Sequence, residues 1–255
     1  MSKVGQNGNL STIINNHIAT IEFGHPASNS FPSELSDRLS DKFNEISLNK
    51  DVHVIVLRSE GDRAFCAGAF FDELMLINNL SEGIKFFSGF ANLINAMRSC
   101  SKLIIGRVQG KVVGGGVGLV SACDYVLTSV NASIKLSELT IGIGPFVIAP
   151  AIERKIGNAA LSELSLNATE WKNAYWAKEK GLYAEVYKTI KELDKEVDFL
   201  SNKLASYNPK ALTEMKKILW EKTDHWEELL IERAKISGEL VLSEYTKKAL
   251  NQFKK

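Results

Sequence analysis

The sequence contains few cysteines and no long hydrophobic run. Its only cysteines are Cys66, Cys100 and Cys123. They are odd in number, form no CxxC pair and lie in apolar segments, so we expect free, buried thiols rather than disulfides. No apolar run is long enough to span a bilayer, and residues 1–10 lack the pattern of a targeting segment. The sequence therefore predicts a soluble, unprocessed protein of the reducing cytoplasm, with no membrane partner.

Neither sign of charge is in excess. Lysine and arginine number 31 against 30 for aspartate and glutamate, which gives a net charge of +1. This balance argues against nucleic acid as a partner, so any anionic ligand must be held by local groups. The four histidines, His17, His25, His53 and His225, lack metal-ligand spacing. We therefore expect no metal site.

Several nucleotide and hydrolase motifs are also missing. Residues 114–118 (Gly-Gly-Gly-Val-Gly) lack the Lys-Ser/Thr ending of a phosphate-binding P-loop, and the dinucleotide pattern G-x-G-x-x-G is not convincingly matched. No G-x-S-x-G nucleophile elbow occurs. These absences exclude the commonest nucleotide-binding and serine-hydrolase classes.

What is present is an alternation of strand and helix patterns. The composition, 45% hydrophobic and 24% charged, is ordinary for a globular protein. Helices are predicted from Ser33 onward, over 84–97 and from near Gly115, and alternate with strands in a way that indicates parallel pairing through right-handed crossovers rather than hairpins. The predicted strands are Ile18–Phe23, Val52–Leu57, Leu103–Val108 and Tyr125–Thr128.

After Asn158 the strand signal disappears. The chain then reads as helices over 159–166, 169–180 and 188–206, followed by two more. No proline-rich or Gly/Ser-rich linker separates this part from the rest. We therefore expect an α/β core over residues 1–200 and a C-terminal helical region over 201–255 that shares the core.

Two short glycine-bearing segments suggest an oxyanion hole. Residues 65–69 (Phe-Cys-Ala-Gly-Ala) and 113–117 (Val-Gly-Gly-Gly-Val) each follow a predicted strand, and ligand crevices of α/β proteins form at the ends of parallel strands. Small residues let a ligand approach backbone N–H groups that the fold holds in place. Either segment alone is about as often a packing turn.

A single carboxylate follows about twenty residues later. Glu138 is flanked by Leu136, Leu139, Ile141 and Ile143, and apolar surroundings raise a carboxyl pKa by desolvation. Such a group can take and return protons near neutral pH. The alternatives are a Glu that caps the turn at 140–142 or pairs with a buried Lys or Arg; the two glycine segments favour the acid–base role.

Together these segments resemble the crotonase family, the enoyl-CoA hydratases and isomerases. The resemblance covers nearly the whole chain, is strongest over 54–145, and includes 122–124 (Ala-Cys-Asp) and 181–183 (Gly-Leu-Tyr). It implies a crotonase-like ββα superhelix core with a C-terminal helical trimerisation region, assembled as a homotrimer or dimer of trimers. It also implies an acyl-CoA substrate of fatty acid metabolism, with no cofactor beyond that coenzyme A.

The resemblance assigns roles by position. The N–H groups of Ala69 and Gly115 would form the oxyanion hole, and Glu138 would be the acid–base. Lys247 or Lys248 would lie near the coenzyme phosphates. The remaining predicted substrate contacts are Pro26, Ala27, Ser28, Ala67, Gly68, Phe70, Gly114 and Phe146. Phe86, Phe87 and Phe90 either line the acyl pocket with Phe146 or are plain core.

One departure bears on the reaction. Family hydratases carry two glutamates, and this chain has Gly118 in place of the first. A single glutamate at the second position is the pattern of the family's Δ3,Δ2-enoyl-CoA isomerases. Asp72 or Glu73 could replace the missing acid, although adjacent acids of this kind are more often solvated or capping.

Double-bond isomerisation is therefore the favoured activity. The alternatives are hydration of an enoyl-CoA, including a carboxylated one such as methylglutaconyl-CoA, and thioester hydrolysis or decarboxylation. A further alternative is a non-catalytic scaffold that binds acyl-CoA, or RNA, after losing the first glutamate.

Overall fold

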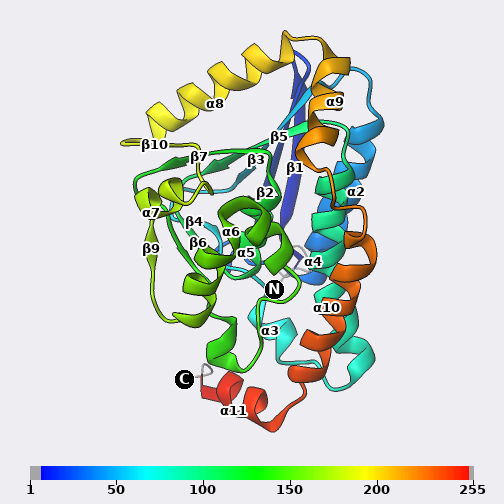
Figure 1. The fold of residues 1–255 in the computed structure, drawn as a ribbon, viewed down its shortest axis with the longest axis vertical. Coiled ribbons are helices and arrows are strands. Elements are labelled where there is room, and N and C mark those ends of the chain that lie inside the picture. Colours follow the sequence, from blue (N-terminus) through cyan, green and yellow to red (C-terminus); the bar gives the residue numbers. More distant parts are fainter. Residues whose placement is uncertain (1–6, 253–255) are drawn as a thin grey trace.

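The computed structural model describes residues 7–252, and they form two β-sheets surrounded by helices (Figure 1). The larger sheet has six strands in the order β1-β2-β3-β5-β7-β10. All its pairings are parallel except that of β1 with β2. Its strands are β1 (Asn9–Asn15), β2 (Ile18–Gly24), β3 (Val54–Ser59), β5 (Leu103–Val108), β7 (Tyr125–Ser129) and β10 (Glu185–Tyr187).

The four strands predicted from the sequence are confirmed, but β1 was not predicted. Its residues are mostly exposed, as suits an edge strand, so no apolar alternation marks it. It pairs with β2 as a hairpin, with Asn16 and His17 in the left-handed region at φ 49° and 63°. The four predicted strands pair in parallel, as expected, and the hairpin is an addition that the unpredicted β1 makes at this edge.

The smaller sheet has four short strands in the order β4-β6-β8-β9. The prediction that strands end before Asn158 is wrong, because β9 lies in the segment expected to be a helix over 169–180, and β10 follows it. Two or three residues are too few to show an alternating pattern. The strands of the smaller sheet are β4 (Ala64–Cys66), β6 (Lys111–Val113), β8 (Ser133–Lys135) and β9 (Lys172–Asn173).

Helices cover both faces of the six-stranded sheet. Leu35, Leu39 and Phe43 recur at helical spacing on α2 and are fully buried in the main core, which α4 shares. On the other face, α8 packs Leu193 and Val197 against the sheet and lies along it at the top of Figure 1. These helices are α2 (Ser33–Leu48), α4 (Leu80–Ser99) and α8 (Ile190–Ala205).

Shorter helices connect the sheets and form the C-terminal part. Gly157 adopts φ +76° inside α6 and kinks it, which any residue with a Cβ would resist. These helices are α3 (Phe71–Leu74), α5 (Gly115–Ala122), the 3₁₀ helix η1 (Glu138–Ile141), α6 (Ala149–Leu166), α7 (Ala174–Glu179), α9 (Pro209–Leu219), α10 (Trp226–Leu240) and α11 (Glu244–Gln252).

Two contacts join the C-terminal helices to the core. A Cβ added to Gly83 of α4 would lie 2.8 Å from the Gly238 carbonyl oxygen of α10, so these helices touch through backbone. The buried Asp124 carboxylate accepts hydrogen bonds from Lys216 Nζ (2.7 Å) and Trp220 Nε1 (2.7 Å), both C-terminal. Because a buried charge is costly without its partners, this contact fixes α9 on the core.

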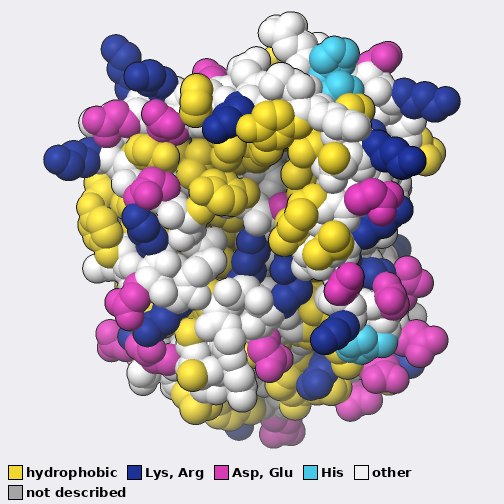
Figure 2. All heavy atoms as spheres, turned by 45° about the horizontal axis from the view of Figure 1, so that its top comes forward, with side chains coloured by type: hydrophobic (Ala, Val, Ile, Leu, Met, Phe, Trp, Pro, Cys, Tyr) yellow, Lys and Arg dark blue, Asp and Glu magenta, His cyan; other side chains and the backbone are white. Residues whose placement is uncertain are grey.

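The surface reflects the balance of charge. On the face shown in Figure 2, lysine and arginine side chains alternate with aspartate and glutamate around a hollow bordered by hydrophobic groups, without a field of one sign. Within residues 7–252 no helix is long and apolar enough to cross a bilayer.

Candidate active site

Most of the predicted site residues line a cavity of about 390 Å³ where β4, β6 and β8 end; they are Ala67, Gly68, Ala69, Gly114, Gly115, Glu138 and Phe146. Its lining is largely apolar. It comprises residues 67–69, 113–115, 137, 138, 140, 141 and 143–148, together with Phe71, Leu74, Phe87, Phe90, Lys135, Trp171 and Ser237. Phe87, Phe90 and Phe146 therefore line it, whereas Phe86 is buried in a neighbouring apolar cluster.

The two glycine-bearing segments are in contact. Gly68 has φ +86°, and a Cβ added there would lie 2.9 Å from the Val113 carbonyl oxygen and 3.5 Å from the Gly115 nitrogen. Both the positive φ and the space favour glycine. The segments far apart in sequence thus form one surface of the cavity.

Two backbone N–H groups on this surface are free. Phe31 forms an isolated parallel bridge with Ala69, in which its N–H donates to Gly68 O (2.8 Å) and its carbonyl accepts from Phe70 N (3.0 Å). The Ala69 N–H consequently points away from Phe31. Within residues 7–252 neither the Ala69 nor the Gly115 N–H has an acceptor. Both can donate to one ligand oxygen.

Close packing explains the glycine triplet. Gly114 adopts φ +53° with ψ −123° before α5. A Cβ on Gly115 would lie 2.3 Å from Phe90 Cε1, and one on Gly116 would lie 2.8 Å from Cys66 Cβ. Gly115 opens α5, whose N-terminal N–H groups carry partial positive charge. These glycines therefore lie where the backbone comes too close to neighbouring side chains for a Cβ to fit.

Glu138 is the first residue of η1, after the end of β8. Its Oε2 is inaccessible to solvent, and within the described chain that atom has no hydrogen-bond partner and the side chain has no ion pair. Burial raises the pKa of Glu138 to about 7, and its own backbone N–H opposes this only in part. The capping and ion-pair alternatives thus find no contact to support them.

The space beside Gly118, where the resemblance predicts the first glutamate of family hydratases, is occupied. A Cβ added to Gly118 would lie 2.4 Å from Ile148 Cγ2, and Ile148 lines the cavity. The nearby acids do not replace it. Glu73 Oε2 accepts the Ser33 N–H at the start of α2 (2.8 Å), and Asp72 is exposed; neither lines the cavity.

The loop predicted to contact coenzyme A borders the cavity on the β4 side. Pro26, Ala27 and Ser28 are exposed, and the Ser28 carbonyl accepts the Ala67 N–H (3.1 Å). Asn29 Nδ2 donates to the carbonyls of Glu60 and Ala64, both at 2.8 Å, which fixes this loop against β4.

Other predicted contacts fall outside the lining. Phe70 packs its ring edge-on against His25, with centroids 4.7 Å apart. Lys247 and Lys248 are exposed on α11. The sequence did not predict Lys135 and Trp171, which also line the cavity. Pairing of β8 with β9 brings Trp171 close to Lys135. A strand of two residues is too short for a sequence pattern to predict it, so this contact was not expected.

The cysteines are free and buried, as predicted. Burial raises the thiol pKa of Cys66 and Cys123 to about 12. Cys66 Sγ accepts the Gly68 N–H at 3.3 Å. These thiols are therefore packing groups rather than nucleophiles. No cluster of three potential metal ligands occurs among residues 7–252.

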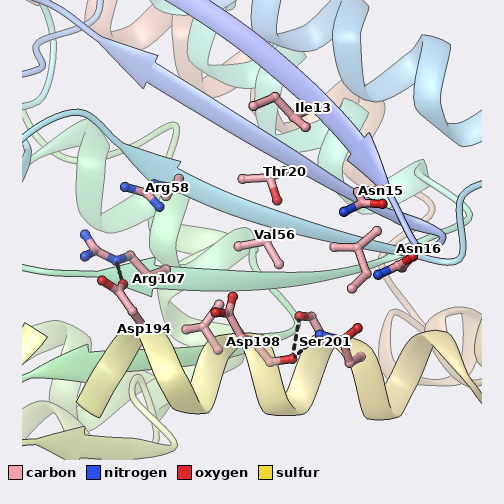
Figure 3. A pocket seen from close by; sticks show the side chains of 13 residues that line it. Ile13, Asn15, Asn16, Thr20, Val56, Arg58, Arg107, Asp194, Asp198 and Ser201 are labelled. Atoms are coloured by element: carbon pink, nitrogen blue, oxygen red, sulfur yellow. Dashed lines mark hydrogen bonds and ion pairs between the residues drawn. The ribbon is translucent and has the colours of Figure 1, made fainter. Parts of the chain in front are cut away.

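A second cavity of about 390 Å³ lies between the six-stranded sheet and α8. Figure 3 shows Arg58 and Arg107 on neighbouring strands, with Arg107 directed to Asp194 of α8. Arg107 is buried, and its Nε donates to Asp194 Oδ1 at 2.8 Å. Arg58 pairs with Glu22 at 2.6 Å. Both arginines that line this cavity thus have a carboxylate partner.

The two-sheet core with its apolar, single-acid cavity defines an enzyme of the crotonase fold. An enoyl-CoA hydratase structure from Bacillus halodurans superposes with a TM-score of 0.87 at 20% identity, covering 95% of this chain and 99% of that one. Over residues 13–254 the sequence matches the family model Enoyl-CoA hydratase/isomerase, and the chain belongs to this family.

Two relatives illustrate the range of the family. A probable enoyl-CoA hydratase of Bacillus subtilis is 26% identical over 246 residues, covering 96% of this chain and 95% of the relative. The peroxisomal Delta(3,5)-Delta(2,4)-dienoyl-CoA isomerase of Arabidopsis thaliana is 28% identical over 204 residues, covering 74% and 69%. Family membership implies an acyl-CoA substrate. The two relatives include both a probable hydratase and an isomerase.

Proposed function

We propose that this enzyme shifts the double bond of an enoyl-CoA with Glu138 as its single acid–base. The observation that carries the proposal is the single acid of the cavity. Glu138 is the one Asp or Glu among the residues that line it, and Ile148 occupies the space beside Gly118 where a second would stand. Water addition is served by two carboxylates that hold and split a water, whereas proton transfer within one substrate needs one base.

The mechanism follows from these groups. The thioester oxygen accepts from the N–H groups of Ala69 and Gly115, which stabilise the negative charge that develops on it. Glu138 removes a proton from C2, the electrons of that C–H bond form C1=C2, and the C1=O pair moves onto the thioester oxygen. The oxygen then re-forms C1=O, the C1=C2 pair becomes C2=C3, and the C3=C4 pair forms the new C–H bond at C4. Glu138 returns the proton for this bond. No water or other reactant is consumed.

The pKa of about 7 suits this role. A general base is most effective when its pKa lies near the working pH, because it must both take and release the proton. Apolar walls also strengthen the interaction of the thioester oxygen with its two donors.

Hydration is the second candidate. The Bacillus subtilis relative is a probable enoyl-CoA hydratase and matches nearly the whole chain, whereas the Arabidopsis relative is a dienoyl-CoA isomerase. A water held by Glu138 alone could add to C3. The product separates these functions, since hydration adds the mass of one water and isomerisation adds none.

The experiment incubates the protein with 3-hexenoyl-CoA and with 2-hexenoyl-CoA, and identifies products by chromatography and mass. We expect interconversion at constant mass, which Glu138→Gln reduces strongly. A 3-hydroxyacyl-CoA product would establish the hydratase, and free coenzyme A a hydrolase. Equal behaviour of the wild type and Glu138→Gln on all thioesters would favour the scaffold.

We also infer a homotrimer or dimer of trimers in the cytoplasm, from family resemblance. The exposed Met215, Ile218 and Leu219 of α9 support an assembly that covers them. Light scattering on the purified protein tests the assembly, and a monomer would contradict it.

A further inference from the structure

Two lysines share one indole ring beside the active-site cavity. Lys135 Nζ lies 5.0 Å and Lys111 Nζ 5.2 Å from the centroid of the Trp171 ring. Lys135 and Trp171 both line the cavity. The antiparallel register, with Ile134 opposite Lys172, continues to bring Lys135 opposite Trp171. The sheet itself therefore sets this arrangement.

The charge of these lysines is not compensated. Within residues 7–252 neither Lys111 nor Lys135 forms an ion pair. Glu138 is three residues from Lys135, yet burial sets its pKa and no lysine lowers it. Two cations near each other repel, and a bound anion would remove that repulsion. The arrangement is therefore suited to a negatively charged ligand group.

The position of this pair separates it from the predicted coenzyme contacts. In the sheet order β4-β6-β8-β9, the loop containing Ser28 borders β4, and Trp171 precedes β9 at the opposite edge (Figure 1). With about 4.8 Å between neighbouring strands, the two edges lie roughly 14 Å apart. The oxyanion donors lie at the ends of β4 and β6, and Glu138 follows β8. An acyl chain that passes Glu138 toward β9 therefore reaches Lys135.

We propose that Lys135, held over Trp171 and supported by Lys111, binds a carboxylate at the far end of the acyl group. The substrate class would be the monothioesters of unsaturated dicarboxylic acids with coenzyme A. This inference rests on the proposed function. The Lys135 ammonium donates to the carboxylate, and the indole face holds the lysine stem and its charge at the cavity. Lys111, one strand away, adds a second positive charge to the subsite.

The test compares two unreactive ligands that differ only at the chain end. Adipoyl-CoA ends in a carboxylate and hexanoyl-CoA in a methyl group, and calorimetry gives the dissociation constant of each. We expect the wild type to bind adipoyl-CoA about tenfold or more tightly than hexanoyl-CoA, the size of one charge-assisted hydrogen bond. Salt should reduce the ratio.

Variants assign the effect to Lys135. Lys135→Met should bring the ratio close to one through weaker adipoyl-CoA binding, and Lys135→Arg should keep the preference. Lys50→Met, which removes an exposed lysine outside the cavity lining, is the matched control and should behave as the wild type. If Lys135→Met does not fold, Trp171→Leu, which frees the lysine from the ring, should lower the ratio.

Each other outcome overturns the inference. Equal affinity of the wild type for both ligands excludes a carboxylate subsite and leaves the proposed isomerisation standing. Equal weakening of both ligands and of free coenzyme A in Lys135→Met would assign the lysine to the coenzyme phosphates. Failure of the wild type to bind either thioester would overturn the proposed function as well.

Discussion

The two cavities have the same volume, about 390 Å³, and differ in how their charges are balanced. Beneath α8, Arg107 and Arg58 each meet a carboxylate, so both arginine charges are paired. At the strand ends, Glu138 Oε2 is buried with no partner in the described chain, and two backbone N–H groups are free. Unpaired groups cost stability, and a reaction can use them. Volume does not distinguish the cavities, whereas ion pairing does, because both arginines beneath α8 meet a carboxylate and Glu138 Oε2 has no partner among residues 7–252.

The largest expected effect is the loss of turnover caused by a substitution in the strand-end cavity, compared with a substitution in the α8 cavity. Glu138→Gln keeps the shape of the side chain and removes the base, so we expect turnover to fall by about 100- to 10,000-fold. Thioester binding should persist in calorimetry. The matched variant Asp194→Asn, in the other cavity, should keep turnover within twofold or so of the wild type. A large loss in Asp194→Asn would mean that the α8 cavity takes part in catalysis.

A second variant tests the free donors. Gly115→Ala places a methyl group where Phe90 stands, so the loop must shift. Losing one oxyanion donor costs about 100- to 1000-fold in rate, measured as kcat/KM. Gly89→Ala is the control, because its added Cβ would meet only ordinary contacts, the nearest at 3.6 Å. Similar rates for Gly115→Ala and Gly89→Ala would exclude the Gly115 N–H as a donor.

The effects of Asp194→Asn and Glu138→Gln on the free energy of unfolding should have the opposite order to their effects on turnover. Asp194→Asn leaves the buried Arg107 without its carboxylate, and we expect a loss of about 1–3 kcal/mol in unfolding free energy, measured in urea. Glu138→Gln should not destabilise the protein at pH 8. If Glu138→Gln were the more destabilising of the two, the carboxylate would have a structural partner, and the contrast between the cavities would fail.

The pH dependence gives a smaller, graded effect. Since burial raises the pKa of Glu138 to about 7, kcat/KM should rise with pH up to about 7 and then level. Stability has the reverse sign: the folded state holds this proton between the unfolded pKa and about 7, so this group's contribution falls as pH rises through that window. Glu138→Gln should abolish it. A wild-type rate that is independent of pH from 5 to 9 would contradict the raised pKa.

The sequence predicted those groups whose defining residues lie close together along the chain. The glycine segments and Glu138 follow buried strands that the sequence marks clearly, and the fold brings these segments to one cavity. Phe70 was predicted as a substrate contact but lies outside the lining. In extended backbone, neighbouring side chains point to opposite sides, so Phe70 faces His25 while Ala69 faces the cavity.

Long-range pairings were beyond local reasoning. Lys135 and Trp171 meet because β9 pairs with β8, and β9 has two residues. The edge strand β1 is mostly exposed and carries no buried stripe. Strands of this kind are defined by partners elsewhere in the chain, so their contribution to a site appears only when the sheet is assembled.

Ile148 beside Gly118 also restricts how this active site can change in evolution. A glutamate introduced at Gly118 alone would meet Ile148 and overpack the core, at a cost of about 1–3 kcal/mol. A smaller residue must therefore replace Ile148 first, and that step gains no second acid. A path to a second acid at this position would therefore pass through an intermediate that has lost the packing of Ile148 without gaining that acid.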